Sequence, residues 1–196
     1  PASLVGSEMC IRDRNTSSIG SINFSSLRGV AYNGEFFALG ETDNKNIYIW
    51  KGIPGLNDEP DYIIQNPVGV GRIDMNDEWL VVSAYPGAGS PVHVINLTNL
   101  DSGIMLPVPG NDDFPQGVSI NEKGFFIALQ GSNKVVGWSS VQDALNGSSP
   151  TMSFGGTTNK TNSGTKMAST VHWDGFHLWV GEFKFSNRLL GFAPSK

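Results

Sequence analysis

The chain has 196 residues, of which 39% are hydrophobic and 16% are charged, and its net charge is −5. This composition excludes a disordered chain, and the lack of a Lys/Arg cluster argues against a nucleic-acid groove or a site for anionic membranes. No apolar run reaches the roughly 18 residues that a membrane-spanning helix needs. The 24 glycines and 11 prolines predict many turns, as in an all-β chain of short strands.

The N-terminal segment differs from the rest of the chain. Residues 4–14 read Leu-Val-Gly-Ser-Glu-Met-Cys-Ile-Arg-Asp-Arg, which resembles a translated sequencing-library adapter. We therefore expect residues 1–14 to be foreign and the native body to begin at residue 15, with a natural N-terminal tail as the alternative. Cys10, the only cysteine, would then leave the body without a disulfide or a Cys-based zinc site. The junction also predicts that upstream repeats are missing.

From residue 18 onward, short apolar segments recur with a fixed period. A first strand is expected near residues 18–20, and four groups follow: 29–32, 36–39, 47–50 and 61–64; 71–74, 79–82 and 91–95; 117–120, 125–129, 135–138 and 151–154; and 170–173, 178–180 and 189–192. Tight polar pairs such as Asn33-Gly34 and Asp174-Gly175 separate the first two strands of each group and favour hairpin turns with positive φ.

The third strand of each group carries the clearest repeat signature. Asn44–Trp50, Ser132–Trp138 and Ser186–Phe192 each combine a polar turn with an apolar strand that ends in an aromatic residue. Trp50 and Trp138 are separated by two periods of about 44 residues, the length of one propeller blade. The last period is longer, and the polar stretch Thr157–Lys166 reads as an inserted loop.

Four antiparallel strands per period predict an all-β fold, a β-propeller with about four blades. The expected blades are residues 15–65, 66–110, 111–156 and 157–196. If further blades are missing, apolar blade faces would be exposed, so we expect the isolated chain to self-associate.

Several phrases resemble those of NHL-repeat propellers. Ile47–Ile64 is similar to the "NRVLIW" strand with its proline-containing loop, Ile19–Ser25 to "LGQPNF", and Leu27–Ala31 to "PRGVA". The resemblance covers about nine-tenths of the chain. It implies that these blades are the C-terminal part of a six-bladed propeller. The second blade departs from the family pattern, because Ser83–Pro86 replaces the usual acidic turn.

The best candidates for ligand binding are polar residues that begin the innermost strands. In a propeller these strand ends surround the central axis, so their side chains would form a funnel able to hold a polar or anionic ligand through arginine. The predicted funnel consists of Arg28, Arg72, Asp74, Gln116, Thr170 and His172. The alternative is a water-filled channel without a ligand.

Other chemistry-bearing residues have structural alternatives. The recurring aromatics Trp50, Trp138 and Phe192 fit packing between blades better than a glycan-stacking site. Glu41 and Glu182 end second strands, where a carboxylate can accept hydrogen bonds from turn N–H groups. The three histidines, His93, His172 and His177, show no spacing that completes a zinc site by itself.

The sequence thus favours a non-catalytic binding module, exported, at the cell surface or periplasmic, whose ligand is a protein or a glycan held at the channel mouth or by the blade loops. The alternative is a metal-dependent propeller enzyme similar to the lactonase or amidating-lyase type. In that case His172, Asp74 and Glu182 would be the ligands of a divalent metal. No other cofactor is expected.

Overall fold

The structure is a computed structural model that describes residues 18–85, 91–108, 114–156, 165–183 and 188–193. The predicted foreign segment and most of the loop expected at residues 157–166 lie outside these residues. A short hairpin of β1 (Ser18–Ile19) and β2 (Ile22–Asn23) comes first. The strand expected near residues 18–20 therefore pairs with β2 rather than with a four-stranded sheet.

Blade 1 is a four-stranded antiparallel sheet in simple up-and-down order. Its strands are β3 (Leu27–Tyr32), β4 (Phe36–Glu41), β5 (Asn46–Lys51) and β6 (Tyr62–Gln65). All four strands were expected from the sequence, with boundaries that differ by at most two residues.

Blade 2 repeats this order with a longer fourth strand. It contains β7 (Val70–Met75), β8 (Trp79–Ala84), β9 (Val92–Asn96) and β10 (Asn99–Leu106). The sequence did not reveal β10, because its middle residues are polar and exposed and its register to β9 shifts between Asn99 and Ile104.

Blade 3 has the most apolar strands. It contains β11 (Pro115–Asn121), β12 (Gly124–Leu129), β13 (Lys134–Trp138) and β14 (Met152–Gly155). A short helix, α2 (Val141–Leu145), links its last two strands and was not predicted.

Blade 4 has three strands in the described part of the chain. These are β15 (Ala168–Trp173), β16 (Leu178–Glu182) and β17 (Leu189–Phe192), and β17 forms the outer edge of the sheet. Among the described residues, no helix has the length and apolar character needed to cross a membrane.

The hairpin turns rest on an Asn or Asp side chain at the end of each innermost strand. The Oδ1 atom of Asn33 accepts hydrogen bonds from the N–H groups of Glu35 and Phe36, at 3.0 and 2.7 Å. Asn76 and Asp174 form the same kind of turn. Gly34 and Gly175 adopt φ values of 100° and 98°, as the sequence predicted. Asp77 does not have a positive φ, although the Asn76 side chain accepts the same two turn N–H groups.

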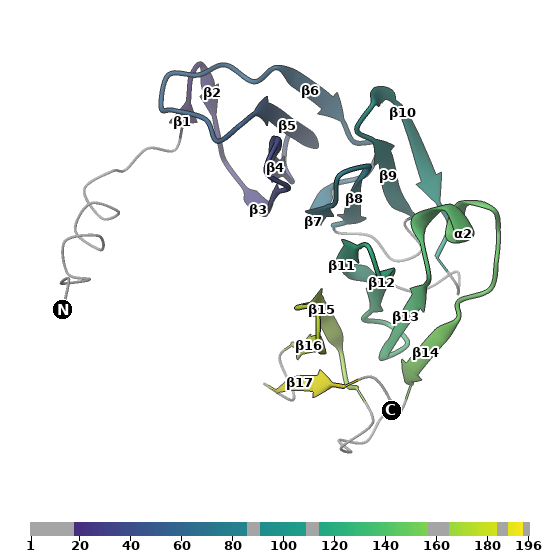
Figure 1. Cartoon of the computed structure of the whole chain (residues 1–196). Helices are drawn as coiled ribbons and strands as arrows, with labels where there is room; N and C mark the ends of the chain where they lie inside the picture. Colours follow the sequence, from purple (N-terminus) through teal and green to yellow (C-terminus); the bar gives the residue numbers. More distant parts are fainter. Residues whose placement is uncertain (1–17, 86–90, 109–113, 157–164, 184–187, 194–196) are drawn as a thin grey trace, which may run out of the picture.

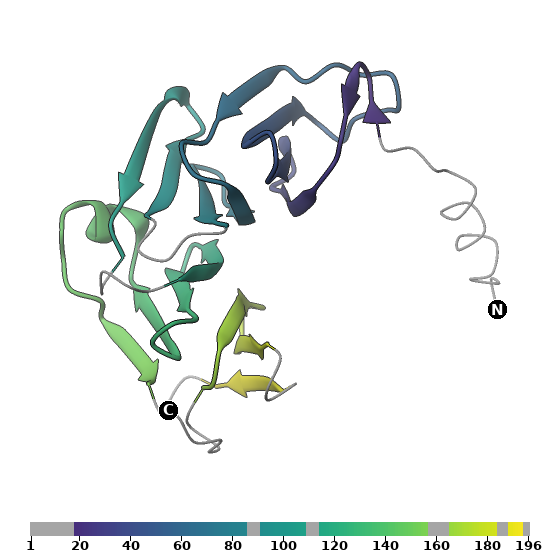
Figure 2. The same ribbon diagram turned by 180° about the vertical axis from the view of Figure 1, so that it is seen from behind.

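The four blades lie side by side along an arc, with the innermost strands β3, β7, β11 and β15 on its concave side (Figure 1). Apolar clusters fill each boundary between blades. Ile73 of blade 2 packs against Ala31 and Ala38 of blade 1, and Phe126 of blade 3 packs against Val171 of blade 4. Blades 1 and 4 stand apart at the two ends of the arc, as the view from behind also shows (Figure 2). The chain is a β-propeller arrangement of four blades.

Two of the three recurring aromatics are core residues, and the third, Phe192, is half-buried against the cluster between blades 3 and 4. Trp50 and Trp138 are 2% and 4% exposed, and each indole N–H donates to a backbone oxygen of the loop that follows its strand, Asp58 O at 3.1 Å and Ser148 O at 2.8 Å. The repeat therefore uses these tryptophans to hold the outer loop of the blade.

Candidate functional site

One mouth of the channel holds a cavity of about 300 Å³. It forms where β7 and β11 begin and where the chain enters β3 and β15, so side chains from all four blades reach it. The polar lining consists of Arg28, Arg72, Gln116, Gln130 and Ser169. The aromatic lining consists of Tyr85, Phe114 and Phe183. We call this cavity the mouth pocket.

Each of the two arginines of the mouth pocket contacts an uncharged neighbouring group, which does not neutralise its positive charge. The guanidinium of Arg28 lies over the ring of Tyr85, 3.6 Å from its centroid. Arg72 Nη1 donates to the backbone oxygen of Arg28 at 3.0 Å. Both side chains are exposed, and within the described ranges no carboxylate forms an ion pair with either one.

A buried serine fixes the strands that carry the pocket. Ser83 is fully buried on β8, and its hydroxyl accepts the N–H of Arg72 at 2.7 Å. The same hydroxyl lies 3.0 Å from the backbone oxygen of Gln116 and donates to it. Ser83 thus ties β7 to β11 at the level of the pocket, which holds Arg72 and Gln116 in a constant relative position.

Farther along the channel, a second polar group joins blades 2, 3 and 4. The Asp74 carboxylate accepts the N–H of Ile120 at 2.9 Å and that of Met75 at 3.0 Å. Burial raises the pKa of Asp74, and its hydrogen bonds from Ile120, Met75 and Ser119 and the nearby charge of His172 offset only part of that effect. Asp74 therefore bonds to the backbone of blade 3 and does not line the mouth pocket.

The six funnel residues predicted from sequence fall into three places. Arg28, Arg72 and Gln116 line the mouth pocket. Asp74 and His172 lie near each other deeper in the channel. Thr170 lies on β15 one residue beyond Ser169, which lines the pocket in its place.

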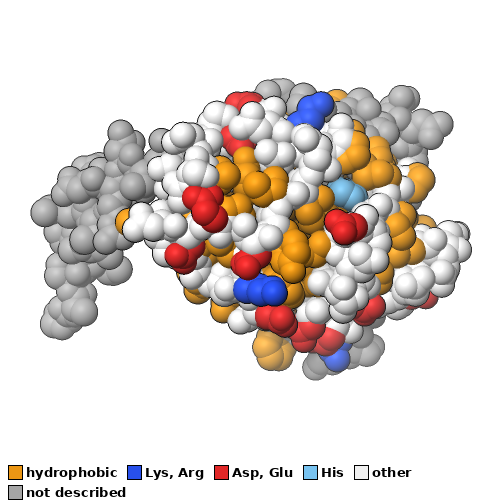
Figure 3. Space-filling model, turned by 90° about the horizontal axis from the view of Figure 1, so that it is seen from above, with side chains coloured by type: hydrophobic (Ala, Val, Ile, Leu, Met, Phe, Trp, Pro, Cys, Tyr) orange, Lys and Arg blue, Asp and Glu red, His pale blue; other side chains and the backbone are white. Residues whose placement is uncertain are grey.

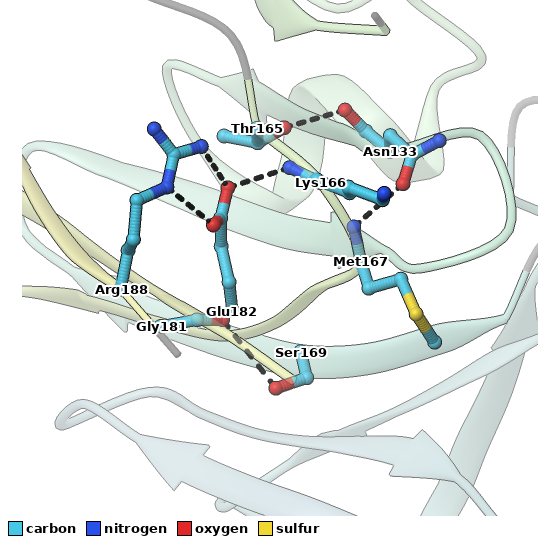
Figure 4. Close-up of polar contacts among 8 residues, drawn as sticks. All are labelled: Asn133, Thr165, Lys166, Met167, Ser169, Gly181, Glu182 and Arg188. Atoms are coloured by element: carbon cyan, nitrogen blue, oxygen red, sulfur yellow. Dashed lines mark hydrogen bonds and ion pairs between the residues drawn. The ribbon is translucent and has the colours of Figure 1, made fainter. Parts of the chain in front are cut away.

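The proposed metal ligands are not brought together. Glu182 accepts from Arg188 Nε at 2.7 Å and from the N–H of Lys166 at 2.6 Å (Figure 4). These bonds engage Glu182 at the end of β16, where it anchors the chain that enters blade 4. Across the residues that the structure describes, no three His, Cys, Asp or Glu side chains group as a metal site. The expected set of His172, Asp74 and Glu182 is therefore wrong as one site.

Glu41 holds the entry to blade 1 in the same way. Its carboxylate accepts the N–H of Ser25 at 2.8 Å, the hydroxyl of Ser25 at 2.9 Å and the hydroxyl of Tyr48 at 3.0 Å. Burial would raise the pKa of Glu41, but the hydrogen bonds from Ser25, Asn44 and Tyr48 outweigh burial and lower it. The structural role expected for both glutamates is the one they have.

The other two histidines have separate environments. His177 Nδ1 lies 3.8 Å from the Asp174 carboxylate beside the hairpin turn of blade 4. His93 is 5% exposed on β9 and packs under Gly103, where a Cβ would lie 2.0 Å from its Nε2 atom. Burial lowers the pKa of His93. The three histidines thus lie in three different places.

Sequence reasoning missed Tyr85, Phe114, Gln130 and Phe183 as pocket residues. Each lies one residue outside an innermost or second strand of the structure at the mouth end, and only Gln130 lies equally close to a strand expected from the sequence. The same backbone bond recurs there in all four blades: Thr42 N–H to Ser26 O, Tyr85 to Gly69, Gln130 to Phe114 and Phe183 to Met167, at 2.7–3.1 Å. Each blade therefore has two residues at the channel mouth that are joined by this backbone hydrogen bond.

Comparison with known proteins supports the fold. No protein-family model matches the sequence, and no curated protein matches it. Among solved structures, the chain is similar to the computationally designed Ika4 protein, with a TM-score of 0.59 and 10% identity over 91% of this chain and 96% of that one. At this identity the likeness shows the fold alone.

Two natural proteins show the same fold within longer chains. The Cps50 (Swd1) β-propeller domain of Myceliophteria thermophila matches with a TM-score of 0.58 and 11% identity over 80% of this chain and 49% of that one. A chain of the nidogen/laminin complex matches with a TM-score of 0.62 and 12% identity over 88% of this chain and 66% of that one. The four blades thus span half to two thirds of these longer chains.

Proposed function

We propose that this protein is a binding module that holds an acidic sugar residue of a glycan in the mouth pocket. The observation that carries the proposal is the pair Arg28 and Arg72, two cations in one concave pocket without a carboxylate partner among the described residues. Arginine binds carboxylates through two parallel hydrogen bonds, which favours an anionic group at this place.

The rest of the lining suits a sugar ring. Gln116, Gln130 and Ser169 supply amide and hydroxyl groups that can bond to sugar hydroxyls, and Phe114 and Phe183 supply apolar surface. The cavity of about 300 Å³ is at the small end of the range for ligand pockets, which fits one residue of a longer chain. A protein ligand is the other partner expected from the sequence.

We also propose that the blades are NHL-like. The phrases that resemble NHL repeats coincide with structural elements, since residues 27–31 begin β3 and residues 47–50 lie on β5. Membership of an exported propeller family would place the mouth pocket where solutes outside the cell can reach it. Blade number and export are separate expectations from the pocket chemistry.

The test is calorimetric titration with a glucuronic-acid disaccharide and with its neutral glucose counterpart at low salt. We expect the acidic disaccharide to bind at least about tenfold more tightly, because a charge-assisted bidentate bond contributes about 1.5–3 kcal/mol. Arg72→Gln should remove this preference, whereas Lys123→Gln, at an exposed turn away from the pocket, should keep it. Equal affinities for the two disaccharides, or binding to neither at millimolar concentration, would contradict the proposal.

A further inference from the structure

The two ends of the arc carry side chains that the repeat normally buries. Val30, Ile73, Val118 and Val171 occupy the same position, three residues before the Asn or Asp of the hairpin turn. Ile73, Val118 and Val171 are 5–6% exposed because each packs against the preceding blade, but Val30 is 61% exposed. No described blade covers this side of β3, which we call the entry face.

Tyr32 extends the entry face. It occupies the position of Met75 and Ile120, which are 6% and 5% exposed, whereas Tyr32 is 46% exposed. Gly29 and Ala31 alternate with these residues and contact Ile73 of blade 2. Since side chains alternate between the two faces of a strand, Val30 and Tyr32 point away from blade 2.

Blade 4 carries the complementary half of the same interface. In blade 3, the ring of Phe126 lies on Gly137 and stacks on Trp173 of the next blade, with 6.2 Å between ring centroids and 15° between planes. Blade 4 repeats the first part of this arrangement, because Trp179 lies on Gly191, where a Cβ would come within 2.9 Å of the indole. Asp174 accepts the indole N–H at 2.7 Å and holds the ring in place.

The outer strand of blade 4 shows the same difference in burial. Leu189 pairs with Gly181 on β17 as Val135 pairs with Ala128 on β13. Val135 is fully buried against blade 4, but Leu189 is 68% exposed. Trp179, Leu189 and His172 thus form an exit face that no described residue covers.

A hydrogen bond crosses the blade boundaries at one repeat position, and the residue at that position in blade 4 is exposed. Asp74 accepts the N–H of Ile120 on the next blade, and Ser119 at the equivalent position accepts the N–H of Trp173 at 3.3 Å. His172 is the next member of this series, and it is exposed on the exit face. The N–H that would meet it belongs to a residue at the position of Tyr32.

The β1–β2 hairpin takes the place of a fourth strand, which the described part of blade 4 does not include. Ile64 and Phe154, on the fourth strands of blades 1 and 3, pack against the following blade. Ile19 and Ile22 make the corresponding contact with Tyr48 and Trp50 of blade 1. The hairpin therefore lies over blade 1 where the fourth strand of a preceding blade would lie, while blade 4 has three described strands.

We propose that a second copy of this chain covers both faces, so that blade 1 of each copy packs on blade 4 of the other and the two arcs close into one ring of eight blades. Each chain carries one entry face and one exit face, and a head-to-tail contact of this kind ends in a closed ring when the rotation allows it. The arc spans nearly the whole Ika4 chain and 49% of the Swd1 propeller domain, so an arc of this size occurs both as one chain and as about half of a larger propeller. The ring would bring four arginines, two from each copy, to the same channel mouth.

The test is light scattering coupled to size-exclusion chromatography on the full chain over a range of concentrations. We expect a species of twice 21.1 kDa. Val30→Glu and Leu189→Glu should each run at the mass of one chain at concentrations where the unchanged protein is dimeric, because they place a carboxylate in an apolar contact. Ile63→Glu, at a residue 55% exposed on the outer strand of blade 1, should remain dimeric.

Mixing the two variants distinguishes a contact between the entry face and the exit face from a contact between two copies of the same face. A Val30→Glu chain and a Leu189→Glu chain retain one unchanged entry–exit contact between them, so the mixture should form a dimer that neither variant forms alone. Far-UV circular dichroism checks that each variant is folded, and Val30→Thr with Leu189→Thr serve as uncharged replacements. A monomeric unchanged protein, open oligomers larger than a dimer, or dimers that survive both charged substitutions would overturn the proposal.

Discussion

The middle blades and the end blades fill one repeat position in opposite ways. Glu41, Ala84, Leu129 and Glu182 each end the second strand of their blade and pair with the first residue of the innermost strand. Ala84 and Leu129, in blades 2 and 3, are each 1% exposed and apolar. Glu41 and Glu182, in blades 1 and 4, are 0% and 9% exposed and carry a charge.

The difference shows that all four blades share a backbone hydrogen bond next to this position, whereas the side chain at the position can be either apolar or charged. The residue after this position donates the same backbone hydrogen bond in all four blades. Where the side chain is apolar, packing fills the space. Where it is a carboxylate, side-chain and backbone donors of the incoming segment satisfy it. A buried charge is stable only when every such partner is present, so the end blades depend on more polar contacts than the middle blades.

The largest expected effect is on the apolar side of this comparison. Leu129→Ala should lower the free energy of unfolding by about 2–5 kcal/mol, because it leaves a cavity at the boundary between blades 2 and 3. Urea denaturation followed by tryptophan fluorescence measures it. Ile53→Ala, at a residue 69% exposed, is the control and should change stability by less than about 0.5 kcal/mol. A Leu129→Ala loss below about 1 kcal/mol would mean that the boundary is not a packed core.

Blade 1 should lose stability even when its buried carboxylate is replaced by a side chain of the same shape. Glu41→Gln should cost about 1–3 kcal/mol, because the amide retains one acceptor oxygen but places an NH₂ group among the donors of Ser25, Asn44 and Tyr48. Glu41→Leu should cost more, although leucine is native at this position in blade 3, since it leaves all these donors unpaired. If leucine is tolerated better than glutamine, the carboxylate network is not what holds blade 1.

Acid should affect blade 1 through Glu41 at a lower pH than it affects blade 2 through His93. The pKa of Glu41 is below its usual 4.5 in the folded state, so its contribution to stability is complete above about 4.5 and is lost as the pH falls through the folded value. Thermal melts between pH 6 and pH 3 should show this loss. Glu41→Gln should flatten the decline, and a variant that follows the same curve as the unchanged protein would assign the acid sensitivity to other groups.

The smallest expected effect is the pH dependence of stability that His93 causes in blade 2. Burial lowers the pKa of His93 below 6.5, so the unfolded chain takes up a proton first and stability should fall as the pH drops below about 6.5. Asp101 is the acidic residue that lines the same groove as His93. His93→Gln should remove the pH dependence between 6.5 and 5 in thermal melts. His177→Gln, at a half-buried position on blade 4, should leave it unchanged.

Surface apolar residues extend beyond the two end faces. The view from above shows hydrophobic side chains at the surface among acidic ones (Figure 3). Tyr62, Ile63 and Ile104 on the fourth strands of blades 1 and 2 are 40–55% exposed. These residues lie on the outer rim, so they provide matched controls for substitutions on the entry and exit faces.

Much of the candidate site was predictable because strand ends are visible in the sequence. Arg28, Arg72 and Gln116 were assigned to the channel mouth from the order of strands, and all three line the mouth pocket. The aromatic half of the pocket was not predicted. Tyr85 lies beside Arg28 across a blade boundary, and no local pattern states which side chains meet between blades.

The amino-acid sequence by itself determined the repeat, the positions of most strands and the turns between the first two strands of a blade, because alternation of apolar residues and the chemistry of Asn, Asp and Gly act over a few neighbouring residues. Only the tertiary structure decided that Glu182 bonds to Arg188, that Asp74 reaches the backbone of blade 3, and that Val30 and Leu189 are exposed. Glu182 and Arg188 meet within one blade, six residues apart. The Asp74 bond and the exposure of Val30 and Leu189 depend on how twisted sheets stack around an axis, which brings together residues about one blade apart in the chain.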